Sequence, residues 1–219
     1  GLRNRNKDLV LDYALETNLL LYQRQHDPVA ADAGENLVRT KAEVSGDISD
    51  EQLIRIGFYM DNAFYRKAAF DNCTSIGLNP AYRFHNDDWQ LTLGAHVDMA
   101  FGFGKQFRAA PDVQVQYNFS DSYLLYAQAT GGKRQNDFRQ LESYNPYGQL
   151  FSQLDATYEQ LNAAIGFKAS PADELWFHVY GGYQDLKDDL FIVPLSSRLI
   201  LGQADARNVY VGGAVDYDY

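Results

Sequence analysis

The most constraining feature of this chain is a run of alternating residues between Trp89 and Phe103. Every second residue is apolar, and the residues between them are polar or small. A period of two places successive side chains on opposite faces of a β-strand. The run also exceeds the ~9–11 residues that a tilted strand needs to cross a bilayer. It therefore predicts a strand with one apolar and one polar face. The apolar positions are Trp89, Leu91, Leu93, Ala95, Val97, Met99, Phe101 and Phe103.

The same alternation recurs along the chain and predicts about ten strands. They cover residues 8–23, 36–46, 51–66, 72–84, 88–104, 111–119, 122–131, 153–169, 174–186 and 206–219. No segment keeps a helical period for a useful length, although Gln135–Gln153 has room for a short helix. The pattern predicts an all-β chain that forms an antiparallel up-and-down transmembrane barrel, with lipid outside and a polar interior.

The connections between these strands alternate in length. Short ones, rich in Gly, Asn, Asp, Ser and Pro, are expected at Gly46–Asp50, His85–Asp88, Ser120–Ser122 and Ala169–Asp173. Longer ones are expected at Gln25–Glu35, Gly131–Ser152 and Lys187–Asp205. Outer-membrane barrels have this layout, with short periplasmic turns and longer external loops. Lys187–Asp205 contains an apolar run that also suits a hairpin above the membrane, a strand edge or a subunit contact.

Aromatic residues flank the short turns, as expected for rings that settle at the water–lipid boundary. Phe84 and Trp89 bracket one turn, and Phe167 and Trp176 bracket another. The alternative is a soluble β-sandwich, where aromatic residues also occur near strand ends and form the core between two sheets. The barrel is the favoured prediction, and the sandwich stays open.

Composition narrows the function classes. The formal net charge is −10 and the chain has no basic stripe, which argues against nucleic acid as a partner. The mean hydropathy of −0.40 and the lack of a long apolar run exclude a helical membrane protein. No linker or composition break interrupts the chain, so residues 1–219 are expected to form a single barrel domain.

Several polar residues are expected to face the interior of the barrel. They are His96, Asp98, Arg55, Arg83, Lys168 and His178. His96 and Asp98 lie two positions apart on one strand and would suit a hydrolase, but no serine partner is identifiable. The favoured interpretation is an inward polar pair that a neighbouring Arg or Lys satisfies. Four dispersed histidines lack metal-ligand spacing, so neither a metal, a cofactor nor an enzyme is predicted.

The segment Gly131–Leu150 is the most unusual in composition. It combines cations with aromatic residues, a mixture that suits contact with a ligand on an outer loop. The candidate contact residues are Lys133, Arg134, Phe138, Arg139, Tyr144 and Tyr147. The alternative is that this loop folds back and packs on the mouth of its own barrel.

The run from Trp89 to Gly132, continuing into KRQNDFRQLESYNPY, resembles the barrel of a TonB-dependent outer-membrane receptor. The resemblance implies a bacterial outer-membrane location and contact with outer-membrane lipid. It also implies import of a small-molecule or glycan ligand with energy from a TonB-type complex. Such barrels have about 22 strands. Ten strands therefore imply a segment of a longer receptor, or a small barrel filled by side chains.

Two functions follow from these patterns. The first is an outer-membrane barrel of receptor or transporter type whose external loops contact a ligand. The second is a soluble or surface-attached β-sandwich that serves as a binding or adhesion domain.

Overall fold

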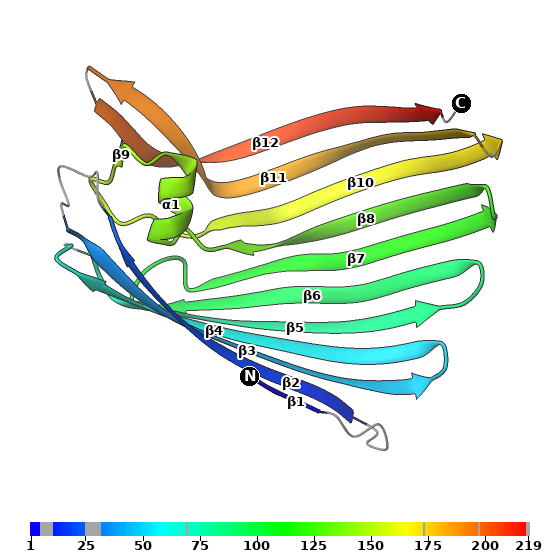
Figure 1. Ribbon diagram of the computed structural model, residues 1–219, viewed down its shortest axis with the longest axis horizontal. Helices are drawn as coiled ribbons and strands as arrows, with labels where there is room; N and C mark the ends of the chain where they lie inside the picture. The colour runs from blue at the N-terminus through cyan, green and yellow to red at the C-terminus, as the bar shows by residue number, and fades with distance from the viewer. Residues whose placement is uncertain (5–10, 25–31, 69, 173, 197, 218–219) are drawn as a thin grey trace.

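The computed structural model describes residues 1–4, 11–24, 32–68, 70–172, 174–196 and 198–217. Within these ranges one sheet contains 12 strands, and one short helix lies beside it (Figure 1). The long strands are β2 (Leu11–Gln23), β3 (Gly34–Ser49), β4 (Gln52–Arg66), β5 (Cys73–His85), β6 (Trp89–Phe101), β7 (Phe107–Ser120), β8 (Tyr123–Arg134), β10 (Thr157–Ala172), β11 (Leu175–Leu195) and β12 (Arg198–Tyr217). The short elements are β1 (Leu2–Arg3), β9 (Gly148–Gln149) and α1 (Phe138–Tyr144).

The long strands follow one another in the sheet in chain order, and each pairs antiparallel with the next. This up-and-down order confirms the predicted fold class. Because the described strands form one sheet and not two stacked ones, the sandwich alternative is wrong. The sheet is open in the described residues, since β2 has β1 as its outer neighbour and β12 has β9. Closure of these strands on themselves is therefore not observed.

The long strands correspond to the predicted ones, and most extend beyond their predicted bounds. β1 and β9 were not expected, because two-residue strands carry no periodic signal. The predicted residues 8–10, most of the connection Gln25–Glu35 and residues 218–219 lie outside the described part of the chain. Among the described residues, no helix is long and apolar enough to span a membrane.

The register gives the sheet one continuous apolar face. Phe58 pairs with Leu78, Leu78 with Val97, and Val97 with Ala109, so the apolar parity continues from strand to strand. Even in the middle of the sheet this face is open, with Ile165 59% and Val179 54% exposed. Soluble monomers rarely expose so extensive an apolar surface. The face therefore suits contact with lipid.

The strand length and the aromatic residues agree with a membrane span. The 13 residues of β6 extend ~43 Å at ~3.3 Å per residue, and a tilt of ~45° reduces their height to ~30 Å. At the short-turn end the rings of Trp89 and Tyr117 stack 4.4 Å apart, and Tyr117 contacts Phe119 at 4.7 Å. These rings form the aromatic belt expected at one membrane boundary.

Local chemistry fixes the short turns at one end of the sheet, on the right in Figure 1. The side-chain Oδ1 of Asn86 accepts hydrogen bonds from the backbone of Asp88 at 3.1 Å and of Trp89 at 2.7 Å. Ser120 Oγ accepts from the backbone of Ser122 at 3.3 Å. Asn and Ser stabilise turns in this way because their short side chains replace a backbone acceptor. Turn residues read from the sequence thus do place the hairpins.

The long connections gather at the opposite end, where α1 lies on the concave side of the sheet (Figure 1). Phe138 and Leu141 of α1 are buried with Ala33, Leu150 and Leu201 in a small core. Lys187–Asp205 is not a long loop, and the alternative prediction of a hairpin is confirmed. β11 and β12 stay paired as far as Leu195 and Arg198, so the hairpin projects beyond its neighbours.

Glycines on the polar face make room for tyrosine rings. Gly166 pairs directly with Tyr126 on the neighbouring strand, and Gly212 pairs with Tyr180. In both pairs the ring occupies the space that a Cβ on the glycine would take. These two glycines therefore mark flat-lying aromatic residues, which stabilise the cross-strand pair.

We expect Gly166→Ala to lower the stability of the sheet by ~1–3 kcal/mol, because the new methyl group forces the Tyr126 ring off its site. The effect is measured by thermal unfolding in detergent, with the loss of heat-modifiable migration on SDS gels as the readout. Gly213→Ala is the matched control, since a Cβ there meets only His178 O at 3.4 Å. Equal transition temperatures for the two variants would contradict this account.

Candidate ligand-binding cavity

The second face of the sheet is polar, and the register places all six predicted interior residues on it. His96 and Asp98 lie on β6, Arg55 on β4 and Arg83 on β5, each opposite the apolar parity of its strand. Lys168 on β10 pairs with His178 on β11. This face lines the concave side of the sheet, where α1 also lies (Figure 1).

His96 and Asp98 lie on one strand but have different partners. His96 Nδ1 lies 2.8 Å from Asn79 Oδ1, and its Nε2 lies 4.0 Å from Asp112 Oδ2. Asp98 is 6% exposed and accepts a short hydrogen bond from the hydroxyl of Tyr59. His96 therefore links β6 to β5 and β7, and Asp98 links β6 to β4 across the intervening β5.

Three of the remaining interior residues, Arg55, Lys168 and His178, contact side chains on other strands. Arg55 Nη1 lies 3.5 Å from Glu43 Oε2. His178 Nε2 lies 2.9 Å from the hydroxyl of Tyr126, and Lys168 Nζ lies 5.8 Å above the same ring. These contacts join β8, β10 and β11 across the polar face. Arg83 is exposed on that face.

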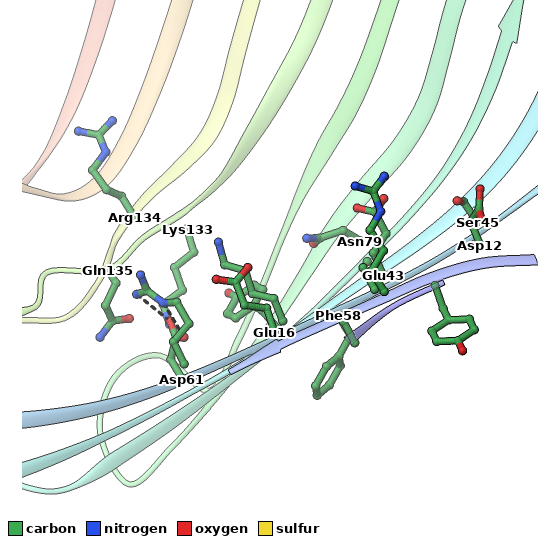
Figure 2. Close-up of a pocket in the computed structure, with 18 of the residues that line it drawn as sticks. Asp12, Glu16, Glu43, Ser45, Phe58, Asp61, Asn79, Lys133, Arg134 and Gln135 are labelled. Atoms are coloured by element: carbon green, nitrogen blue, oxygen red, sulfur yellow. Dashed lines mark hydrogen bonds and ion pairs between the residues drawn. The ribbon is translucent and has the colours of Figure 1, made fainter. Parts of the chain in front are cut away.

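A broad cavity of about 850 Å³ opens on the polar face near the long-connection end (Figure 2). Its walls come from β1 to β5 on one side and from the end of β8 and the start of α1 on the other. Figure 2 shows Lys133 and Gln135 approaching from the β8 side, across from Glu16 and Asp61, while Phe58 points away to the apolar face. The cavity thus brings together segments far apart in the sequence.

The cavity is rich in cations although the whole chain is acidic. Six basic residues line it against five acidic ones, whereas the chain has 19 basic and 29 acidic residues. The basic residues are Arg3, Arg39, Lys41, Lys133, Arg134 and Arg139, and the acidic ones are Asp12, Glu16, Glu43, Asp61 and Asp137. The charge balance of the cavity is therefore slightly positive although that of the chain is negative, which makes the cavity a candidate site for an anion.

Not all of these cations are available to a ligand. Arg39 donates two hydrogen bonds to Asp61, at 2.9 and 3.2 Å, and is neutralised by it. Lys133 Nζ is shielded from solvent and lies 5.7 Å above the ring of Tyr59. Arg134 and Arg139 are exposed, and neither forms an ion pair with the residues that the structure describes. They are the exposed cations of this wall, and Arg3 and Lys41 are exposed cations on the opposite one.

The predicted ligand-contact residues of Gly131–Leu150 separate into distinct environments. Lys133 and Arg134 end β8, and Arg139 lies on α1 at the cavity wall. Phe138 is only 2% exposed, so it belongs to the core and offers no surface to a ligand. Tyr144 and Tyr147 are 46% and 64% exposed. The segment thus folds back on the barrel mouth and still presents two cations to the cavity.

A local irregularity turns Lys133 inward. Thr130 pairs with Asn162 and Gly132 with Glu159, so β8 and β10 are out of step between these pairs. Gly132 adopts a φ of 142°, a backbone conformation that favours glycine. A bulge of this kind re-aims the next side chain. Alternation alone would have placed Lys133 on the apolar face.

Asp155 joins the connections at this end of the structure, and no pattern in the sequence predicted that role. Its carboxylate accepts hydrogen bonds from the backbone of Lys105 at 3.0 Å, from Ala156 at 2.7 Å and from Arg108 Nη2 at 3.2 Å. Its backbone also exchanges two hydrogen bonds with the side chain of Gln203. Asp155 thereby joins the connection after β6, the start of β7 and β12, which are remote from it in sequence.

No known family profile matches the chain, and no curated protein matches it in sequence. Solved structures do match. The FrpB iron transporter from Neisseria meningitidis (F3-3 variant) covers 99% of this chain and 40% of its own, with a TM-score of 0.63 and 15% identity. The match to the siderophore receptor PirA from Pseudomonas aeruginosa covers 94% of this chain and 44% of PirA, with a TM-score of 0.64 and 12% identity. The match to the copper transporter OprC covers 95% of this chain and 41% of OprC, with a TM-score of 0.54 and 14% identity.

The fold is that of an outer-membrane receptor barrel. The predicted resemblance to the barrel of TonB-dependent receptors is confirmed at the level of the fold. The predicted location, the bacterial outer membrane, is that of these receptors. The chain spans about two fifths of the length of the structures it matches.

Proposed function

We propose that this chain forms part of the barrel wall of an outer-membrane receptor that imports a small anionic ligand. The observation that carries the proposal is the pair of exposed guanidinium groups, Arg134 and Arg139, at the wall of the 850 Å³ cavity. Guanidinium groups bind carboxylate and other planar anions through paired hydrogen bonds. A cavity of this size suits a small-molecule ligand.

The structural neighbours support a metal chelate as the ligand class. They include an iron transporter and a siderophore receptor by name. A ferric chelate with free anionic groups would satisfy both the size and the charge of the cavity. The same neighbours support the further proposals that residues 1–219 are one segment of a longer receptor and that a TonB-type complex energises import. A glycan ligand is the weaker candidate, because uncharged sugars would leave the cavity cations unused.

We expect Arg134→Glu and Arg139→Glu each to weaken binding of an anionic ferric chelate by about five- to tenfold. Two probes separate charge from size: the iron(III) tris-catecholate complex is strongly anionic, and the iron(III) tris-hydroxamate complex is neutral. Quenching of tyrosine and tryptophan fluorescence in detergent measures both affinities. The loss should diminish at high salt, because ions screen exposed charges.

Lys67→Glu is the matched control, since Lys67 is an exposed cation of the connection after β4 that lies outside the cavity lining. It changes the net charge of the chain equally and should leave both affinities unchanged. If Lys67→Glu weakened binding as strongly as Arg139→Glu, the loss of affinity would come from the net charge of the protein and not from this cavity. Unchanged affinity in both cavity variants would exclude this site.

A further inference from the structure

The segment that carries α1 is held against the sheet by a buried carboxylate that lacks a cationic partner of its own. Glu35, near the start of β3, is 2% exposed. Its Oε2 accepts a hydrogen bond from the backbone of Phe138 at 2.6 Å, whereas Oε1 is buried with no hydrogen-bond partner among the described residues. An ionised carboxylate in this position loses hydration without full compensation.

A second carboxylate lies beside the first. Asp137 is 7% exposed and caps α1, because its Oδ1 accepts from the backbone of Gln140 at 2.8 Å. Two like charges near one helix start disfavour simultaneous ionisation. Arg39 on β3 is the cation that acts on Glu35, and it donates two hydrogen bonds to Asp61.

The other titratable groups near Glu35 are neutral partners. Tyr65 on β4 and Cys73 on β5 both face Glu35 from the sheet. At the far end of α1, Glu142 accepts a hydrogen bond from the Tyr22 hydroxyl at 2.8 Å and lies 3.9 Å from Arg24 Nε. That end therefore has a carboxylate with a cation beside it, and the Glu35 end does not.

Glu35 lies just beyond the membrane-facing part of its strand. The last outward apolar row at this end contains Leu21 and Phe64, which are 66% and 46% exposed and pair with Asn36 on either side. Glu35 is the next residue toward the long connections. Burial, together with the charge of Asp137, raises the pKa of Glu35 from 4.5 to about 7.

We propose that the segment around α1 is a pH-responsive latch: it docks on the sheet when Glu35 is protonated and loosens when Glu35 is ionised beside Asp137. Because the pKa of Glu35 is higher in the docked state than in a solvated one, protons favour docking. The stabilisation is complete at low pH and is lost as the pH rises through about 7. Gln135, Arg139 and Gln140 line the cavity, so loosening removes one of its walls.

Hydrogen exchange of the backbone amides in residues 138–144, corrected for intrinsic rates, tests the latch in the intact protein without any ligand. Between about pH 5.5 and about pH 8 the corrected exchange rate should rise by about tenfold or more. Glu35→Gln is uncharged at both pH values and should abolish this rise. A wild-type rate independent of pH, or an undiminished rise in Glu35→Gln, would overturn the proposal.

A second variant guards against a folding defect in Glu35→Gln. Asp137→Asn keeps a capping side chain, since Asn and Asp cap helices about equally well, but removes the neighbouring charge. It should reduce the pH effect while leaving α1 docked. Asp12→Asn, a cavity carboxylate on β2 remote from α1, is the matched control and should retain the full wild-type rise. Because no ligand is used, this test can fail while the ligand-binding proposal stands.

Discussion

Placing an arginine at Ile165 is expected to cost the barrel ~2–4 kcal/mol, the value for a cation on the lipid face at the bilayer midplane. Ile165 lies in the middle of β10, is 59% exposed and points to the apolar face. In a bilayer its surroundings are hydrocarbon, and a guanidinium there has no water or counter-ion. Equilibrium unfolding in urea from phospholipid vesicles measures the loss.

Gln128→Arg is the matched control for Ile165→Arg. Gln128 on β8 pairs with Ala164, the residue before Ile165, so the two positions lie at the same height on opposite faces. Its long polar side chain already lines a cavity on the concave side. We expect a change below ~1 kcal/mol there. Equal losses at the two positions would show that the apolar face does not contact lipid.

Removing the Asp155 carboxylate is expected to cost ~2–4 kcal/mol and to loosen the long-connection end of the sheet. Asp155→Ala leaves two backbone N–H groups without their acceptor, those of Lys105 and Ala156. It also leaves Arg108, whose side chain is 10% exposed, with Asp188 as its remaining ion-pair partner. Urea unfolding gives the global loss, and proteolysis of the connection at 102–106 gives the local one.

Two substitutions sharpen the test of Asp155. Asp155→Asn preserves the shape and one acceptor oxygen, so its loss should lie between those of the wild type and the alanine variant. Asp121→Ala removes an exposed aspartate from a short turn and should change stability by less than ~0.5 kcal/mol. If Asp155→Ala behaves like Asp121→Ala, the hydrogen bonds of Asp155 do not hold this end together.

Much of the barrel wall was predictable because its chemistry is local. Alternation places apolar residues such as Leu93 and Val97 on one face regardless of what lies elsewhere in the chain. Asn86 and Ser120 hold their turns through hydrogen bonds to residues two or three positions away. The six predicted interior residues share the polar face for the same reason.

The cavity was less predictable because its walls depend on register and on the return of the chain. Lys133 belongs to it only because the bulge near Gly132 reverses the expected parity. Phe138 was predicted as a ligand contact from the composition of its segment, but it is buried in the core. Asp155 and Glu35 are single carboxylates in unremarkable stretches, and only their partners, remote in sequence, give them a function.

The sequence alone determined that this chain forms long amphipathic strands joined by alternating short and long connections, since both properties follow from neighbouring residues. The tertiary structure alone decided which polar side chains meet, where α1 docks and how the cavity acquires its positive charge. These outcomes depend on inter-strand register and on contacts across 100 or so residues, such as that between Glu35 and Phe138. A two-residue period carries no record of such distances, because it repeats identically wherever the strands are placed.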